Sequence, residues 1–80
     1  MYYTPEMRRA FNSVPKPNSK LRMEVLDNEH FLVLRLDTSS LRSMTGEEQK
    51  ESVIYAIKVK KALEQAGANV LVTREPEQRR

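Results

Sequence analysis

The segment from Thr45 to Gly67 has the clearest helical spacing of apolar residues in the chain. Thr45 and Glu48 form a capping-box pattern, in which each side chain accepts a hydrogen bond from a free backbone N–H of the first turn. Gly67 suits the left-handed conformation that ends many helices. These signals predict one long helix, whose buried stripe at about 100° per residue consists of Tyr55, Ala56, Val59, Ala62, Leu63 and Ala66.

A second apolar group on this helix falls outside that stripe. Val53, Ile54 and Ile57 project to another side, where they are mixed with Lys50, Lys61 and Glu64. Two interpretations remain open. Either the helix has a broad surface toward the core, or the second group contacts the N-terminal segment or another subunit.

Two strands are predicted ahead of the helix, at 21–26 and 31–36. In the first, Leu21, Met23 and Val25 alternate with charged residues, as in a half-buried strand. The second is apolar on both faces, which is typical of a central strand. The short polar turn between them indicates an antiparallel hairpin.

A third strand is predicted at 69–74, after the long helix. A strand, a helix and a strand in succession imply a right-handed crossover and a parallel strand pair. The sequence therefore predicts a small α/β (α+β) domain of ββαβ type. Its three-stranded mixed sheet has the order 1-2-3, with one long helix on one face.

Residues 1–20 are predicted to form an N-terminal arm and linker. Thr4-Pro5 is a helix-start signal, and Met7 and Phe11 share one face, so a short helix is expected over 5–12. The arm is interpreted either as frayed or as docked on its own domain or on a neighbouring subunit. The predicted division is an arm and linker at 1–20, the ββαβ domain at 21–74 and a flexible tail at 75–80.

One helix covers only one face of such a sheet. The other face carries Phe31 and Val33, with one set of side chains from each neighbouring strand. Burying roughly 400 Å² there would contribute about 10 kcal/mol gross. We therefore expect the arm or a second copy of the sheet to cover it. The predicted partner-binding residues are Tyr2, Tyr3, Met7, Phe11, Phe31, Val33, Val53, Ile54 and Ile57.

The composition excludes several kinds of chemistry. The 80 residues include no cysteine and a single histidine, His30, which excludes disulfides, thiolate nucleophiles and Cys/His zinc patterns. We predict no catalytic set, metal site or cofactor. No apolar run approaches the roughly 18 residues of a membrane span, and the N-terminus lacks the apolar core of a signal peptide. A cytoplasmic protein is expected, with no membrane partner.

The charge distribution supports an alternative function. Fourteen basic and eleven acidic residues give a net charge of +3, and basic residues gather between Arg8 and Arg22 near several aromatic residues. Basic and aromatic groups together suit single-stranded nucleic acid or RNA. The predicted anion or nucleic-acid contacts are Arg8, Arg9, Lys16, Lys20, Arg42, Lys58 and Lys61.

The polar segment from Asp37 to Gly46 joins the second strand to the long helix, where α/β proteins often bind ligands. Arg42 and several hydroxyl groups are suited to an anion at a helix start. However, Glu47 and Glu48 would repel one, and no Walker or dinucleotide glycine pattern is present. We interpret the segment as a polar connecting loop, with anion binding as the alternative.

The run from Ala62 to Arg74, together with Glu48 at the helix start, resembles zinc-dependent N-acetylmuramoyl-L-alanine amidases. In that family a strand ends in an Asp-Pro-Gly-His segment that supplies a zinc-binding histidine. Here the corresponding place reads Asp37-Thr38-Ser39-Ser40, without a histidine. Glu48 matches the acidic ligand, but a catalytic zinc needs about three protein ligands. The resemblance therefore implies a shared local architecture, and the activity is not carried over.

No catalytic arrangement follows from the remaining residues. His30 and Asp37 flank opposite ends of the second predicted strand, roughly 20 Å apart at about 3.3 Å per residue, which argues against a Ser-His-Asp triad. We therefore predict a non-enzymatic protein–protein interaction module that forms a homodimer or joins a larger assembly. A basic module that binds single-stranded nucleic acid or RNA is the alternative.

Overall fold

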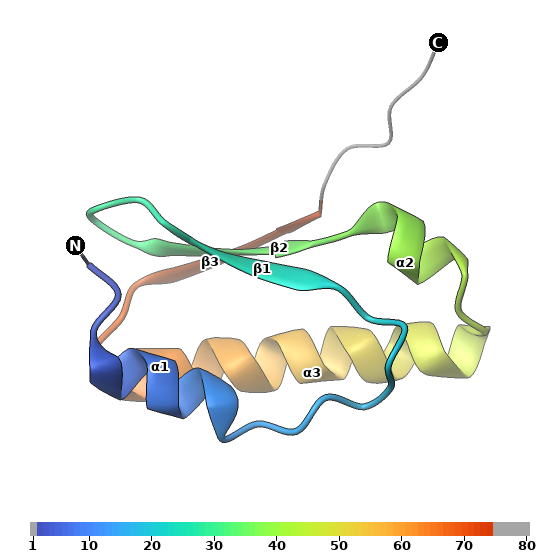
Figure 1. Cartoon of the computed structure of the whole chain (residues 1–80), viewed down its shortest axis with the longest axis horizontal. Coiled ribbons are helices and arrows are strands. Elements are labelled where there is room, and N and C mark those ends of the chain that lie inside the picture. The colour runs from blue at the N-terminus through green and yellow to red at the C-terminus, as the bar shows by residue number, and fades with distance from the viewer. Residues whose placement is uncertain (1, 75–80) are drawn as a thin grey trace, which may run out of the picture.

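The computed structural model describes residues 2–74. In chain order the elements are α1 (Pro5–Asn12), β1 (Met23–Asp27), β2 (Leu32–Leu36), α2 (Thr38–Arg42), α3 (Gly46–Gln65) and β3 (Val70–Arg74) (Figure 1). The predicted small α+β domain is confirmed, with a three-stranded mixed sheet, one long helix and a short N-terminal helix. The predicted tail at 75–80 lies outside the described residues.

The long helix α3 begins and ends at the predicted signals. The Thr45 side chain accepts a hydrogen bond from the Glu48 N–H, and the Glu48 carboxylate accepts one from the Thr45 N–H. After Ala66, Gly67 takes a φ of 97°, which a residue with a Cβ adopts only with strain. Four residues of the predicted stripe are buried: Tyr55, Ala56, Val59 and Leu63.

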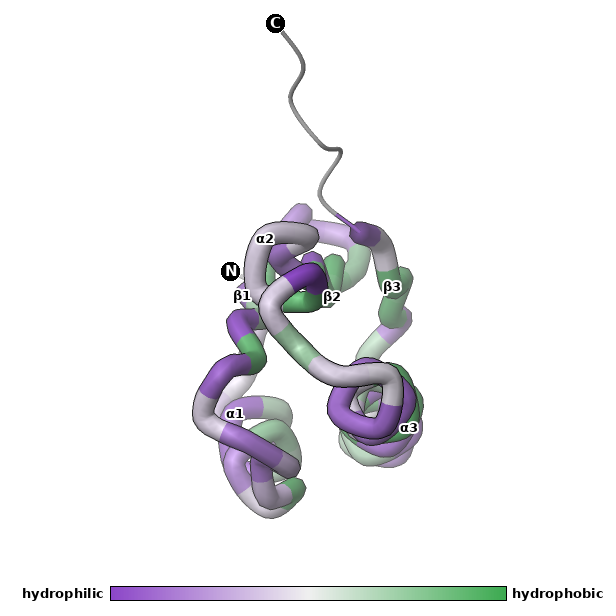
Figure 2. The backbone as a smooth tube through the Cα atoms, turned by 90° about the vertical axis from the view of Figure 1, so that its right-hand side faces the viewer, coloured by the Kyte–Doolittle hydropathy of each residue, from purple (hydrophilic) through white to green (hydrophobic). Residues whose placement is uncertain are grey.

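The sheet has the strand order β1-β2-β3. β1 and β2 are antiparallel, with Val25 opposite Leu34, whereas β2 and β3 are parallel, with Leu34 opposite Val72. Both α1 and α3 lie on the same face of this sheet, which we call the inner face (Figure 2). α1 lies on the side of β1 and α3 on the side of β3, so two helices together cover one face.

The core fills the space between the inner face and the two helices. Leu32 and Leu34 of β2 and Val59 and Leu63 of α3 have no exposed surface. Met7 of α1 is 6% exposed and belongs to the same cluster. The N-terminal helix is therefore part of the core.

Hydrogen bonds also hold the arm on its own domain. The backbone N–H groups of Tyr2 and Tyr3 donate to the Asp27 carboxylate at 2.9 and 3.0 Å. The Asn69 N–H donates to the Tyr2 hydroxyl at 2.8 Å, and the Arg8 guanidinium lies 5.4 Å from the centre of the Tyr3 ring. The arm thus packs beside α3 on the inner side, and among the described elements nothing from the arm covers the opposite, outer face (Figure 1).

Several boundaries differ from the sequence interpretation. The expected connecting loop contains α2, because the Asp37 side chain caps the N–H of Ser39 and Leu41 is buried beneath the turn. Strand β1 starts two residues later than predicted, because Leu21 is buried ahead of the ladder with its N–H bonded to Asn18. Within residues 2–74, no helix combines the length and hydropathy needed to cross a bilayer.

We predict that Met7→Ala lowers the free energy of unfolding by about 2–4 kcal/mol, because it leaves a cavity between α1 and the core. Arg9→Ala on the exposed side of the same helix is the matched control and should change stability by about 0.5 kcal/mol or less. Chemical denaturation measures both. Equal, small effects would mean that α1 does not belong to the cooperative core.

The pH dependence of stability tests the Asp27 anchor. Hydrogen bonds from the backbone N–H groups of Glu29, Tyr3 and Tyr2 hold the pKa of Asp27 below its ordinary value. A carboxyl with a depressed folded-state pKa stabilises the fold above its unfolded pKa of about 3.9. That stability is lost as the pH falls through the folded-state value.

We therefore expect Asp27→Asn to lower the melting temperature at neutral pH and to weaken its decline below about pH 4. The amide replaces one acceptor oxygen with a donor that faces backbone N–H groups. Glu29→Gln is the control, since it neutralises a neighbouring side chain and leaves these hydrogen bonds intact. Identical pH profiles for the wild type and Asp27→Asn would contradict the anchor.

Candidate interaction surface

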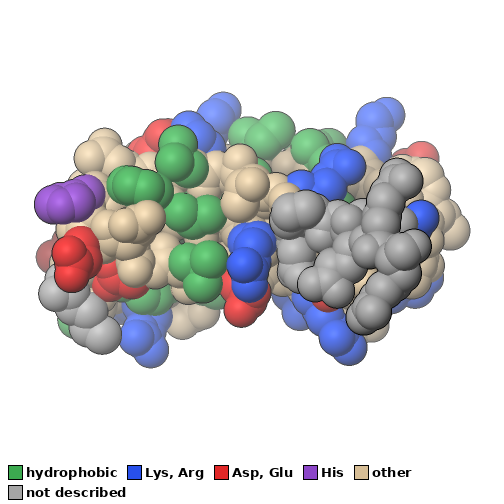
Figure 3. All heavy atoms as spheres, turned by 90° about the horizontal axis from the view of Figure 1, so that it is seen from above, with side chains coloured by type: hydrophobic (Ala, Val, Ile, Leu, Met, Phe, Trp, Pro, Cys, Tyr) green, Lys and Arg blue, Asp and Glu red, His purple; other side chains and the backbone are tan. Residues whose placement is uncertain are grey.

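A row of apolar side chains crosses the outer face of the sheet. The register places Leu26 of β1 opposite Val33 of β2, and Val33 opposite Leu71 of β3. Leu26 is 37% exposed and Leu71 is 56% exposed, while Val33 and the neighbouring Phe31 are partly buried. Seen from above the sheet, green hydrophobic side chains gather over the strands between charged ones (Figure 3). We call these four residues the outer apolar row.

Polar groups bound this row on one side. Arg35 of β2 forms an ion pair with Glu24, which lies opposite it on β1, and Thr73 lies opposite Arg35 on β3. The outer face is therefore apolar toward the β1–β2 turn and polar toward α2. A surface that changes from apolar to polar along the strands suits a partner that covers only part of it.

The two edges of the sheet differ in chemistry. β1 carries Glu24 and Asp27, and the main chain of Tyr2 and Tyr3 is bonded to Asp27, so charge and the arm protect this edge. β3 has neither lysine nor proline, and four of its five residues are exposed. It has the features of an unprotected edge.

The ladder shows which backbone groups of β3 point outward. The Leu32 N–H donates to the Asn69 carbonyl, and Leu32 stands opposite Val70. In a parallel ladder, alternate residues direct both N–H and C=O toward one neighbour. Asn69 and Leu71 therefore direct hydrogen-bonding groups toward β2, whereas Val70 and Val72 direct theirs away from the sheet. No other described strand pairs with that edge.

The second apolar group of α3 remains on the surface. Val53, Ile54 and Ile57 are 44–47% exposed. Val53 lines the same hollow as Arg74 at the end of β3, whereas Ile54 lines a hollow with Pro15 and Pro17 of the linker. The group is therefore divided between the β3 side and the linker side of the helix.

Ile57 and Val72 lie at about the same level of the fold. α3 and β3 run in opposite directions from the loop at Gly67, and Val53 lies near Arg74. Along α3, Ile57 lies about one helical turn, or about 5.4 Å, closer to this loop than Val53 does. Along β3, Val72 lies two residues, or about 6.6 Å, closer to the loop than Arg74 does. Val72 is 41% exposed. The side of the molecule formed by α3 and β3 therefore carries exposed apolar residues on both elements, which we call the edge strip: Val53, Ile57, Leu71 and Val72.

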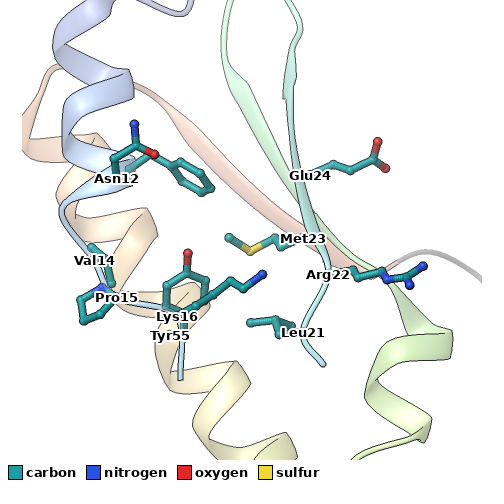
Figure 4. A pocket seen from close by; sticks show the side chains of 10 residues that line it. Asn12, Val14, Pro15, Lys16, Leu21, Arg22, Met23, Glu24 and Tyr55 are labelled. Carbon is teal, nitrogen blue, oxygen red and sulfur yellow. The ribbon is translucent and has the colours of Figure 1, made fainter. Parts of the chain in front are cut away.

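A cleft of about 590 Å³ opens between the linker and β1 (Figure 4). Its lining includes the apolar or aromatic residues Phe11, Leu21, Met23 and Tyr55, and the cation Lys16. Burial raises the pKa of the Tyr55 phenol above its ordinary value. The cleft is lined by apolar and aromatic side chains together with Lys16, Arg22 and Glu24.

The predicted basic contacts are dispersed over the molecule. Lys20 forms an ion pair with Glu48 at 2.9 Å, and Arg8 lies against the Tyr3 ring. Lys16 and Arg22 line the cleft together. The others lie on separate surfaces: Arg9 on α1, Arg42 beside Val53, Lys58 beside the linker prolines, and Lys61 on the exposed side of α3.

The start of α3 is occupied by the chain's own carboxylate. Glu48 accepts hydrogen bonds from the Thr45 N–H and the Lys20 ammonium group, and these lower its pKa. The anion-binding position that the sequence offered is thus filled by Glu48. Among residues 2–74, no group of three His, Cys, Asp or Glu residues could hold a metal ion.

Several predicted contact residues are used within the domain. Met7 is buried, and Tyr2, Tyr3 and Phe11 are partly buried against the core, so their contacts are intramolecular. Phe31, Val33, Val53, Ile54 and Ile57 keep exposed surface.

The sequence interpretation did not single out Leu26, Leu71 or Val72. Their signal was the alternation of the two outer strands, which assigns Leu26 and Leu71 to the outer face.

Comparisons with protein-family models, curated proteins and solved structures found no match for this chain.

Proposed function

We propose that this protein is a small, non-enzymatic protein–protein interaction module. The observation that carries the proposal is the uncovered apolar surface formed by the outer apolar row and the edge strip. Six large hydrophobic residues are at least 37% exposed within the described part of the chain: Leu26, Val53, Ile54, Ile57, Leu71 and Val72. Exposed large hydrophobic residues that gather on one face and one edge of a small domain are typical of contact sites.

The energetics favour covering this surface. Apolar area removed from water contributes about 25 cal/mol per Å², so covering a few hundred Å² stabilises a complex by several kcal/mol before the cost of association. The most deeply buried apolar residues, including Leu32, Leu34 and Val59, are already covered by contacts between the sheet and the helices. An external partner is therefore the available source of further burial.

The placement of the reactive side chains supports a binding role over catalysis. His30 is exposed and precedes β2, whereas Asp37 and the serines of α2 follow it. Nucleophilic catalysis needs a base within hydrogen-bonding distance of the nucleophile. The Asp37 and Ser40 side chains instead cap α2 and bond to its backbone.

We expect site-specific photo-crosslinking, carried out in the cells that express the protein, to identify the contact surface. A benzophenone side chain at Leu71 or Ile57 should give a discrete crosslinked product, because these positions lie on the edge strip. The same group at Arg9, an exposed position on α1, is the control. Equal yields at all positions, or no product at any of them, would overturn the proposed function.

Nucleic-acid binding is the second candidate, and one observation favours it. Lys16 of the linker and Arg22 ahead of β1 both line a cleft that also contains Phe11 and Tyr55, together with one acidic residue, Glu24. The aromatic residues of the arm support it less, because Tyr2 and Tyr3 are bonded to Asp27 and packed against the core.

This second function predicts salt-sensitive binding of single-stranded oligonucleotides, measured by fluorescence anisotropy. Lys16→Glu with Arg22→Glu should weaken binding by about tenfold or more, since each phosphate contact adds to counterion release. Lys50→Glu with Lys61→Glu is the control for net charge, because it reverses two exposed cations of α3 that lie outside the cleft. Absence of binding at about 20 mM salt, where phosphate contacts are strongest, would exclude this function.

A further inference from the structure

We propose that the partner of the edge strip is a second copy of this chain, joined to it by antiparallel pairing of the two β3 strands. This inference rests on the proposed function and identifies the partner. The two three-stranded sheets would form one six-stranded sheet with the order β1-β2-β3-β3′-β2′-β1′. A two-fold axis would pass through the centre of the β3–β3′ pair, as in isologous dimers.

The backbone of β3 is complementary to itself. Val70 and Val72 direct N–H and C=O groups away from β2, as the Leu32–Asn69 hydrogen bond requires. In an antiparallel pair, residues that exchange two hydrogen bonds alternate with residues that exchange none. When Val70 of one copy lies opposite Val72 of the other, the two residues can exchange two hydrogen bonds. The two-fold axis generates a second, identical pair. Leu71 then stands opposite Leu71 of the second copy.

The side chains favour this register over the nearest alternative. With Leu71 at the axis, two leucines that are each 56% exposed meet on the outer face, and Val70 meets Val72 on the inner face. Residues 69–73 carry no charge, so no like charges oppose each other. Placing Val72 at the axis would instead set Arg74 opposite Val70.

The helix layer extends the same contact. α3 lies beneath β3 (Figure 2), and its exposed Val53 lines the same hollow as Arg74 at the end of β3. A two-fold axis at Leu71 brings the α3 strips of the two copies toward each other. On the same helix, Lys60 and Glu64 form an ion pair at 2.7 Å, which neutralises charge near the strip.

A second copy fits this edge better than the β1 edge or the outer face. Asp27 and Glu24 charge the β1 edge, and the arm is bonded there. The outer apolar row gives way to the Glu24–Arg35 ion pair and lacks unpaired backbone groups. A five-residue strand is about 17 Å long, so the interface lies at the small end for specific complexes. We therefore expect a dimer that dissociates on dilution.

Single cysteines test the register, because the natural chain has none. Leu71→Cys should form a disulfide-linked dimer under mild oxidation, since residues opposite each other at a non-hydrogen-bonded pair lie within the span of a disulfide. Thr73→Cys is the matched control on the same face of the same strand. Its two copies would be four residues out of register, about 13 Å apart. We expect Leu71→Cys to crosslink about tenfold faster or more, because its thiols are held together.

Lysine substitutions separate the edge from the face. Leu71→Lys and Leu26→Lys change exposed leucines that flank Val33 on opposite sides. Sedimentation at concentrations up to about 1 mM should show that Leu71→Lys abolishes the dimer, while Leu26→Lys shifts its dissociation constant by about twofold or less. Circular dichroism confirms that both variants fold.

Three results would overturn the inference: equal crosslinking rates for the two cysteine variants, a dimer abolished by Leu26→Lys alone, or a wild-type chain that stays monomeric at about 1 mM. None of them decides the proposed function, which depends on the crosslinked products formed in cells. If the group at Leu71 crosslinked to a different protein while the purified chain stayed monomeric, the proposed interaction module would stand. The proposal that its partner is a second copy would be rejected.

Discussion

The packing of β2 against α3 determines how the rest of the chain is arranged. Leu32, Leu34, Val59 and Leu63 have no exposed surface and belong to one cluster, so the centre of the inner face is committed to the core. α3 alone lies on the side of β3, and α1 fills the space on the side of β1 (Figure 2). Both helices are thereby used on one face. The opposite face and the β3 edge keep their apolar residues on the surface.

The arm illustrates how a short chain completes its core. A domain of this size buries only about 60–65% of its unfolded surface, so each additional core residue matters. Met7 inserts into the cluster, and Asp27 holds the start of the arm through the N–H groups of Tyr2 and Tyr3. The same bonds protect the β1 edge. The arm therefore stabilises one side of the sheet and leaves association to the other side.

Local patterns predicted most of the fold. The capping box at Thr45 and Glu48 and the stop at Gly67 depend on neighbouring residues and are found where the sequence predicted them, and the three strands lie within one or two residues of their predicted bounds. The docking side of the arm was not predictable, because the Tyr2–Asn69 and Tyr3–Asp27 hydrogen bonds join residues far apart in sequence. The alternation of side chains along β3 assigned Leu71 and Val72 to opposite faces of the sheet. It could not show how much of each side chain stays exposed to solvent. That depends on how far α3 extends beneath β3.

Amide hydrogen exchange measured against protein concentration tests the central claim most directly. The N–H groups of Val70 and Val72 point away from β2, whereas that of Leu71 points toward it. In dilute solution we expect Val70 and Val72 to exchange fast and Leu71 slowly. At high concentration all three should be protected, because the outward groups then bond to a second β3. Fast exchange of Val70 and Val72 at every concentration, in a chain that still associates, would contradict edge pairing.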